Sequence, residues 1–188
     1  MTKAETRKVA LRQRRNLSQE EVTALSLRLL TQFSTLDFSQ IGTIHLFIPI
    51  EEKNEPNTFL FIDWLTLNHP EIKIIVPRAD FDTALMTHHQ YTHKDDLQKN
   101  IYNILEPAAS DGYYGQIDLV LVPLLAFDLR GYRVGYGKGF YDRFLENVPA
   151  KKIGLSFFEN VDIIEDIHDS DIRLDFCITP ERIFYFEN

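Results

Sequence analysis

The sequence predicts an α/β fold in which helices cover both faces of a mostly parallel or mixed sheet. Two short segments, Ile74–Val76 and Leu119–Val122, are continuously apolar, as expected of strands that are buried on both faces. Segments of helical composition lie between such strands along the chain, which is typical of parallel sheets. With 188 residues, of which 44% are hydrophobic, we expect one domain, residues 1–188, with a core of its own.

The predicted helices follow from composition and capping patterns. Residues 3–15 contain neither Gly nor Pro and are rich in good helix formers. Ser18 followed by Glu21 forms a capping-box pattern, which predicts that a second helix begins there. Asn57 and Thr58 are suitable N-caps for a third helix. In order, the predicted helices are residues 3–15, 18–33, 57–67 and 138–147.

The predicted strands are segments rich in β-branched and aromatic residues. In order, they are residues 41–48, 73–76, 84–91, 117–122, 152–157, 175–179 and 183–186. Pro77 and Pro123 directly follow two of these strands and are expected to end them. Because ligands of such sheets bind beyond the carboxyl ends of the strands, the loops after Val76 and Val122 are the expected site. Arg78 in the first loop is either a site residue or half of a surface ion pair.

Charge is distributed unevenly along the chain. Residues 1–15 hold six basic residues against one acidic residue, a balance of +5, whereas the remaining 14 basic and 27 acidic residues give −13. An acidic body argues against nucleic-acid binding, including an RNA-binding module built on the basic helix. The basic segment is expected to contact either the protein's own acidic surface or an anionic ligand such as a nucleotide phosphate.

Composition also predicts where the protein works. The longest segment without a charged residue has thirteen residues, 38–50, which is shorter than the roughly 20 that cross a membrane. No secretory signal follows the charged N-terminus. Cys177 is the only cysteine and lies in an apolar run, so we expect a core thiol and a cytoplasmic location. His88, His89 and His93 are expected to form a solvated polar segment rather than a metal site.

Half of the glycines of the chain fall within nine residues. Of eight glycines, the four in this cluster are Gly131, Gly135, Gly137 and Gly139. Such a loop brings backbone N–H groups close to an anion and can form a phosphate cradle. Arg133 and Lys138 could supply charge to phosphate oxygens, and Asp142, one helical turn after Lys138 and expected on the same helical face, could hold Mg²⁺.

The loop matches neither common phosphate motif. Read as a P-loop, it has Tyr132 where the first glycine is required and Gly139 after the lysine. Read as G-x-G-x-x-G from Gly135, it ends on Phe140 instead of glycine. A flexible structural loop therefore remains an alternative to a phosphate cradle.

The glycine-rich loop nevertheless carries a family resemblance. The chain resembles the 5-formyltetrahydrofolate cyclo-ligase family over nearly its full length. The most specific match runs from Val122 through Phe127-Asp128 to Gly131-x-Arg133-x-Gly135-x-Gly137-Lys138-Gly139-Phe140-Tyr141-Asp142. Lys3 followed by Arg7, Pro77-Arg78 after a strand and the late acidic segment also fit the family.

The resemblance implies both a fold and an activity. The fold is a three-layer α/β/α sandwich similar to that of ribose-phosphate isomerases and CoA transferases. The activity is conversion of 5-formyltetrahydrofolate to 5,10-methenyltetrahydrofolate with ATP and Mg²⁺, releasing ADP and phosphate through a phosphorylated, imidate-like intermediate. The alternatives are a non-catalytic nucleotide- or folate-binding protein and a sugar-phosphate isomerase or CoA-transferase relative. The partners implied are small molecules, with the protein a monomer or weak homo-oligomer.

The resemblance also assigns residues by position. ATP contacts fall on Lys3, Arg7, Arg133, Val134, Gly135, Tyr136, Gly137, Lys138, Gly139, Phe140 and Tyr141. Folate contacts fall on Arg7, Glu55, Tyr102, Tyr136, Gly137, Lys138, Gly139 and Phe140. Lys138 and Arg133 are the expected catalytic residues, and Asp142 and Asp171 the expected metal ligands.

Three positions depart from the family pattern. Phe140 stands where many members have Tyr, so only stacking is expected there. Tyr102 stands where some members have Trp. The loop over residues 49–55 is about two residues longer than usual, so Glu51 or Glu52 competes with Glu55 for the folate-binding role.

Overall fold

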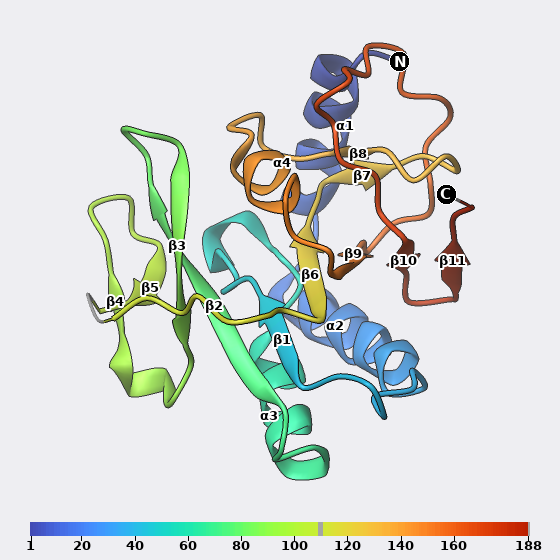
Figure 1. The fold of residues 1–188 in the computed structure, drawn as a ribbon. Coiled ribbons are helices and arrows are strands. Elements are labelled where there is room, and N and C mark those ends of the chain that lie inside the picture. The colour runs from blue at the N-terminus through green and yellow to red at the C-terminus, as the bar shows by residue number, and fades with distance from the viewer. Residues whose placement is uncertain (109–110, 188) are drawn as a thin grey trace.

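A seven-stranded mixed sheet organises the computed structural model, which describes residues 1–108 and 111–187 (Figure 1). The strand order is β11-β10-β9-β6-β1-β2-β3. The five inner strands are parallel, and each edge strand pairs antiparallel with its neighbour. The strands are β1 (Thr43–Leu46), β2 (Lys73–Asp80), β3 (Leu85–Gln90), β6 (Leu119–Pro123), β9 (Lys151–Leu155), β10 (Phe176–Ile178) and β11 (Ile183–Tyr185).

Helices pack on both faces of this sheet, which confirms the predicted α/β class. The helices are α1 (Lys3–Arg15), α2 (Gln19–Phe33), α3 (Phe59–Asn68) and α4 (Phe140–Leu145), with 3-10 turns η1 (Glu51–Lys53) and η2 (Lys94–Asp96). Helices α2 and α3 share a core with one face, and α4 packs on the other. Capping boxes at Thr2 and Ser18 begin α1 and α2, the second as predicted. None of the described helices is long and apolar enough to cross a membrane.

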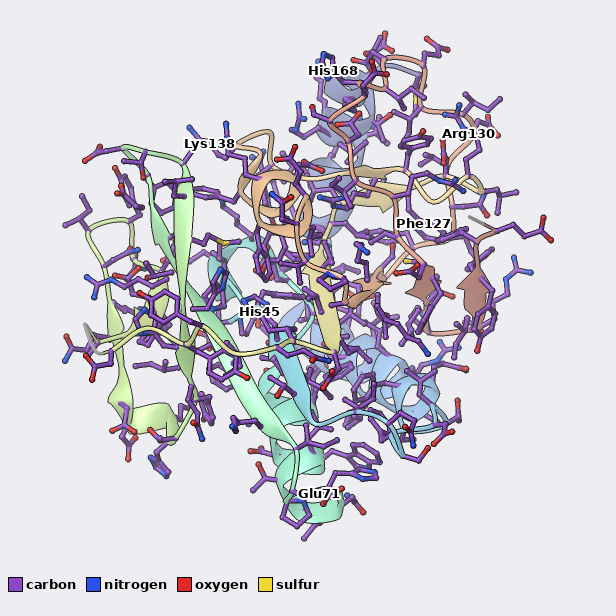
Figure 2. All side chains as sticks on the ribbon, viewed as in Figure 1. His45, Glu71, Phe127, Arg130, Lys138 and His168 are labelled. Carbon is purple, nitrogen blue, oxygen red and sulfur yellow. The ribbon has the colours of Figure 1, made fainter. Side chains whose placement is uncertain are left out.

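Side chains alternate between two cores within the continuously apolar strands. In β6, Leu119 and Leu121 face the core under α2 and α3, whereas Val120 and Val122 face the core under α4. Both faces are covered, so neither set needs to be polar. Side chains fill both layers (Figure 2). In β9, a Cβ at Gly154 would lie 2.6 Å from Leu124, so the second core is tightly packed there.

The structure corrects two predicted boundaries. Strand β2 does not end before Pro77 but continues to Asp80, paired with β3. Beyond Ile75, β2 has no pairing with β1, so one of its edges is open and a missing N–H is tolerated there. Helix α4 begins at Phe140 rather than near Lys138 because the preceding glycines have left-handed backbone angles.

Two small hairpins were not predicted. Strands β4 (Leu97–Lys99) and β5 (Leu105–Pro107) form one, and β7 (Ala126–Phe127) and β8 (Arg133–Val134) form the other. Strands of two or three residues are too short to show an alternating pattern. The β7–β8 hairpin is important because its second strand leads into the glycine-rich loop.

Candidate functional site

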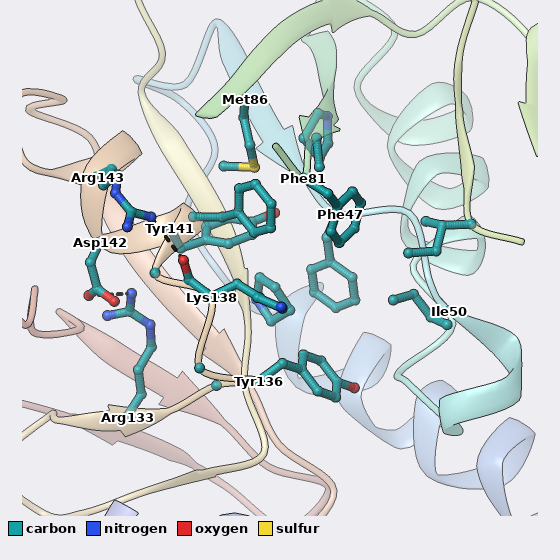
Figure 3. A pocket seen from close by; sticks show the side chains of 18 of the residues that line it. Phe47, Ile50, Phe81, Met86, Arg133, Tyr136, Lys138, Tyr141, Asp142 and Arg143 are labelled. Carbon is teal, nitrogen blue, oxygen red and sulfur yellow. Dashed lines mark hydrogen bonds and ion pairs between the residues drawn. The ribbon is translucent and has the colours of Figure 1, made fainter. Parts of the chain in front are cut away.

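A cavity of about 870 Å³ lies beyond the carboxyl ends of the inner strands. Phe47 and Ile48 follow β1, Pro77 belongs to β2 and Pro123 ends β6, and all four line the cavity. From β1 the chain proceeds to β2 on one side of the sheet, and from β6 to β9 and β10 on the other. The cavity therefore lies where the strand order reverses, which is the usual ligand site of such sheets. Figure 3 shows aromatic and charged side chains converging there.

The cavity brings together most of the residues expected at the site. Those in its lining are Lys3, Arg7, Glu55, Arg133, Gly135, Tyr136, Gly137, Lys138, Gly139, Phe140, Tyr141, Asp142 and Asp171. Two expected residues lie outside the lining. Val134 is buried in a small core with Ala10 and Leu125. Tyr102 is 51% exposed.

Tyr102 still belongs to the rim of the cavity through its ring contacts. Its ring centroid lies 4.4 Å from that of Phe81, which in turn lies 5.3 Å from the ring of Phe140. Phe81 and Phe140 both line the cavity. Tyr102 therefore packs against Phe81, outside the aromatic residues that line the cavity.

The glycine-rich loop has the backbone angles that glycine favours. Gly137 and Gly139 have φ values of +87° and +69°, in the left-handed region that L side chains rarely adopt. Arg7 of α1 donates from Nε to the carbonyl oxygen of Gly135, with 2.8 Å between the atoms. A Cβ at Gly137 would lie 3.3 Å from the Arg7 guanidinium. The loop thus lies directly against α1, and the basic helix faces the site.

Two ion pairs occupy the polar side of the cavity. Arg133 donates to Oδ1 of Asp142 at 2.8 Å, and Lys3 pairs with Oδ2 of Asp171. The same oxygens also accept backbone N–H groups, Ile172 on Asp142 at 3.1 Å and His168 on Asp171 at 2.6 Å. These bonds fix each carboxylate at the cavity wall.

The two carboxylates are suited to Mg²⁺. In the described part of the chain, Oδ2 of Asp142 and Oδ1 of Asp171 have no hydrogen-bond partner, so each carboxylate keeps one oxygen available. Mg²⁺ is commonly held by one or two carboxylates together with phosphate oxygens and water. No group of three or more His, Cys, Asp and Glu within the described ranges could hold a metal alone. A metal at this place would need ligands from a bound substrate.

Lys138 lies in the loop before α4, not on the helix. The expectation that Lys138 and Asp142 share a helical face is therefore wrong, although both line the cavity. The Lys138 ammonium makes no ion pair with any residue that the structure describes, whereas Lys3 and Arg133 are paired. Lys138 is therefore available to a bound anion.

Glu55, and not its neighbours Glu51 and Glu52, lies in the cavity wall. Its side chain is 4% exposed, and Oε2 accepts the Ile50 N–H at 2.7 Å. Glu51 and Glu52 are exposed on η1, and Glu52 accepts from Asn103. Burial raises the pKa of Glu55, against the opposing effects of Arg14 and the Ile50 N–H.

Arg14 contacts the site although the sequence did not predict it there. Its side chain is 2% exposed and donates to the Tyr136 hydroxyl at 3.2 Å. Thr6, Ala10 and Arg14 follow one another at four-residue spacing on the buried face of α1. That spacing is a usable signal, because a basic residue in line with two small buried ones points toward the protein interior.

The apolar part of the lining was also overlooked. It includes Phe47, Ile48, Ile50, Phe81 and Met86. Hydrophobic residues after a strand look the same in sequence whether they enter the core or a pocket. Lys53 is a further lining residue, and its ammonium lies 4.2 Å from the centroid of the Tyr136 ring.

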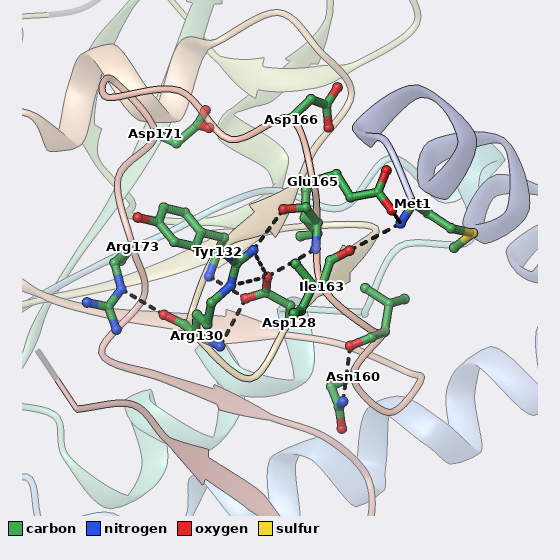
Figure 4. A network of polar contacts seen from close by, with 12 residues as sticks. Met1, Asp128, Arg130, Tyr132, Asn160, Ile163, Glu165, Asp166, Asp171 and Arg173 are labelled. Atoms are coloured by element: carbon green, nitrogen blue, oxygen red, sulfur yellow. Dashed lines mark hydrogen bonds and ion pairs between the residues drawn. The ribbon is translucent and has the colours of Figure 1, made fainter.

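Asp128 fixes the base of the hairpin that leads to the glycine-rich loop. Its buried carboxylate pairs with Arg130 at 2.6 Å and accepts the N–H groups of Tyr132 and Ile164, each at 3.2 Å (Figure 4). Asp128 does not line the cavity. The carboxylate joins the hairpin to the segment that carries Asp171, so its role is to hold two parts of the site together.

The three histidines expected to be a solvated polar segment differ from one another. His93 is exposed as expected, but His89 is buried, and His88 packs beneath α4 with its Nδ1 atom 3.1 Å from Nε2 of the fully buried His45. Burial lowers the pKa of His88 to about 4 and lowers that of His45 well below its usual range. Cys177 is a buried free thiol, as expected. Arg78 forms an ion pair with Glu106 at 3.4 Å.

Comparisons with known proteins match this architecture. Residues 1–180 match the 5-formyltetrahydrofolate cyclo-ligase family. A 5-formyltetrahydrofolate cyclo-ligase of Mycoplasma pneumoniae is 35% identical over 146 residues, covering 75% of this chain and 74% of that protein. A solved 5,10-methenyltetrahydrofolate synthetase of Aquifex aeolicus superimposes with a TM-score of 0.82 at 28% identity, covering 100% of this chain and 94% of its own. The Mycoplasma pneumoniae synthetase structure gives 0.71 at 28% identity, covering 95% and 98%.

Proposed function

Because the chain belongs to the 5-formyltetrahydrofolate cyclo-ligase family, we propose that it converts 5-formyltetrahydrofolate to 5,10-methenyltetrahydrofolate with ATP and Mg²⁺. Residues 1–188 act as a single catalytic domain. The free thiol of Cys177 is compatible with a reducing compartment, and we assign the protein to the cytoplasm. The observation that carries the proposal is one cavity that holds a glycine-rich loop, a buried carboxylate and a lysine, Lys138, with which no described residue forms an ion pair.

The reaction requires that a poor leaving group be activated. The formyl oxygen attacks the γ-phosphorus of ATP, and the bond from that phosphorus to ADP breaks. The neighbouring folate nitrogen then attacks the formyl carbon and loses its proton, and the carbon–oxygen bond breaks to release phosphate. Such chemistry depends mainly on alignment of the two substrates and on neutralising phosphate charge.

The residues of this chain supply both requirements. Lys138 and Arg133 neutralise the charge that develops on the transferred phosphoryl group, and backbone N–H groups of the loop over residues 135–139 cradle the remaining phosphates. Lys3 and Arg7 approach from α1 and close the nucleotide side of the cavity. Mg²⁺ held by Asp142 and Asp171 supplies further charge neutralisation when it is bound.

The folate side of the cavity is apolar with one buried carboxylate. Glu55 accepts hydrogen bonds from N–H groups of the folate ring system. Phe140 and Tyr136 flank the ring, and Tyr102 supports Phe140 from behind through Phe81. A cavity of about 870 Å³ is large enough to bring two such ligands together, since typical ligand pockets measure about 300–1,000 Å³.

An absorbance assay tests the proposal. The purified protein is mixed with 5-formyltetrahydrofolate, Mg²⁺ and ATP, and formation of the methenyl chromophore is followed with time. A rise that requires ATP supports the proposed reaction and excludes an isomerase or transferase that needs no ATP. Folate binding by calorimetry without ADP release would instead establish the non-catalytic alternative.

A further inference from the structure

Arg14 is a buried cation behind the wall of the cavity. It lies in the last turn of α1, outside the lining, and donates to the Tyr136 hydroxyl at 3.2 Å and to the Leu124 carbonyl oxygen. Within the described part of the chain, no carboxylate lies at ion-pair distance from it, and its Nε atom has no hydrogen-bond partner. A buried guanidinium without a direct counter-ion is costly, so a function for its charge must be sought nearby.

Glu55 is the acidic residue whose pKa Arg14 influences, and Tyr136 interacts with both side chains. The Tyr136 hydroxyl accepts from Arg14 and interacts with the Glu55 carboxylate. The positive charge of Arg14 favours the ionised form of Glu55 and is the strongest influence that opposes the effect of burial on its pKa. Arg14, Tyr136 and Glu55 therefore form a chain of interacting side chains that leads from the protein interior to the cavity surface.

The backbone around these side chains is held by α1 as well. Asn54 donates from Nδ2 to the carbonyl oxygens of Arg14 at 2.8 Å and Leu17 at 3.1 Å. The Ile50 N–H fixes one Glu55 oxygen from the other side of the loop. The end of α1 thus positions both the loop that carries Glu55 and, through Tyr136, the carboxylate itself.

We propose that Arg14 is a positioning residue, which orients Tyr136 and the loop that carries Glu55 at the cavity wall, so that the site selects ligands presenting N–H donors. The inference rests on the proposed function for the identity of the ligand, a reduced folate. Arg14 itself touches neither substrate, because it does not line the cavity. The loss of its charge is expected to act on folate binding through Glu55, whereas a general loss of packing would also disturb the loop over residues 135–139 and therefore the nucleotide.

The pH dependence follows from the charges that face Glu55. These are Arg14 from α1, Lys53 from η1, and the hydroxyls of Tyr136 and Tyr141. Without the positive charge of Arg14, the pKa of Glu55 rises. The carboxylate is then lost at a higher pH than in the wild type, so folate binding weakens earlier as the pH falls.

Steady-state kinetics of Arg14→Met test the proposal, with Arg14→Lys as the charge-retaining variant and Arg15→Met as the matched control on the exposed face of α1. The KM for 5-formyltetrahydrofolate is expected to rise about tenfold in Arg14→Met, and more at low pH, while the KM for ATP and kcat change less than about threefold. Arg14→Lys is expected to restore most of the folate KM. An equal rise in both KM values would overturn the proposal, because it would mean general loss of packing.

A double-mutant cycle separates charge from packing. In a Glu55→Gln background, Arg14→Met is expected to change the folate KM by less than about twofold, because its target is already neutral. The same tenfold change in both backgrounds would show that Arg14 acts independently of Glu55 and would refute the inference. If Arg14→Met does not fold, Arg14→Gln, which also removes the charge but keeps a polar side chain, enters the same cycle.

A ligand-free measurement distinguishes this inference from the proposed function. Carbon-13 NMR of labelled glutamate carboxyls gives the titration of Glu55, assigned by its loss in Glu55→Gln. The pKa of Glu55 is expected to be higher in Arg14→Met than in wild type and in Arg15→Met. An inactive wild type with this shift would reject the proposed function alone, whereas an active wild type without it would reject the inference alone.

Discussion

The two walls of the cavity are built on different principles. On the first wall, which we call the phosphate wall, the charged residues Lys3, Arg133, Lys138, Asp142 and Asp171 line the cavity, and four of them form the direct pairs Arg133–Asp142 and Lys3–Asp171. On the wall formed by Glu55, Tyr136 and the hidden Arg14, opposite charges are buried and separated by a tyrosine. A directly paired charge can exchange its partner for a bound ligand, whereas a buried charge without a direct partner depends on fixed geometry. The first wall is suited to a phosphate–metal ligand and the second to recognition of a neutral ring.

The largest expected effect is that of removing the Lys138 ammonium from the phosphate wall. Lys138→Ala is expected to lower kcat by about 10³-fold, because a preorganised charge on the transferred group is lost. The melting temperature is expected to stay near that of wild type, since no residue that the structure describes pairs with this ammonium. Lys99→Ala, at the exposed end of β4, is the control. Unchanged turnover in Lys138→Ala would contradict the assignment of this residue.

The shape of the phosphate wall is tested by Gly135 and Gly137, the two glycines on either side of Tyr136. Gly137→Ala is expected to destabilise the protein by about 1–3 kcal/mol and to raise the KM for ATP, because its φ of +87° strains an L residue and its Cβ would lie 3.3 Å from Arg7. Gly135→Ala is the matched control for stability, since nothing lies within 4 Å of its added Cβ and its φ is not positive. Equal losses of stability on chemical denaturation would argue against the strain.

Neutral histidines beneath α4 make the stability of this region depend on pH. His45 and His88 have pKa values lowered by burial, the latter to about 4, whereas the unfolded chain binds protons near pH 6.5. Since the unfolded state then binds more protons, the free energy of unfolding is expected to fall as the pH drops from 6.5 toward 4. Urea unfolding at several pH values measures this slope. His88→Gln is expected to make it shallower, and an unchanged slope would show that the pair does not cause it.

The smallest effect on the folate KM is expected for a substitution of Glu52, a neighbour of Glu55 in sequence. Glu52→Gln alters an exposed carboxylate on η1 that lies outside the cavity lining. It is expected to change the folate KM by less than about twofold, whereas Glu55→Gln removes the carboxylate of the site. A larger effect of Glu52→Gln than of Glu55→Gln would assign the folate-binding role to Glu52 instead.

The contrast between the walls also explains which residues of the site the sequence predicted and which it did not. Four clustered glycines with Arg133 and Lys138 mark the phosphate wall, because backbone angles and charge are encoded locally. The buried wall was only partly predicted. Glu55 came from a family resemblance, and Arg14 was overlooked because its function depends on contact with Tyr136, 122 positions away.

The fold was predicted more completely than its boundaries. Continuous apolar strands separated by helices determine an α/β class, and that class was confirmed. The continuation of β2 past Pro77 depends on the open edge beside it, and the late start of α4 depends on the angles of Gly137 and Gly139. Both are consequences of neighbours in space, which a local pattern does not encode.

Gly154 connects the packing of the core to the position of Arg14 behind the cavity wall. A Cβ there would lie 2.6 Å from the Leu124 side chain and 2.7 Å from that of Leu174. Leu124 also provides the carbonyl oxygen that holds Arg14. Close-packed interiors transmit such displacements instead of absorbing them. A side chain larger than hydrogen at Gly154 is therefore expected to displace Leu124 and, through the Leu124 carbonyl oxygen, the guanidinium of Arg14.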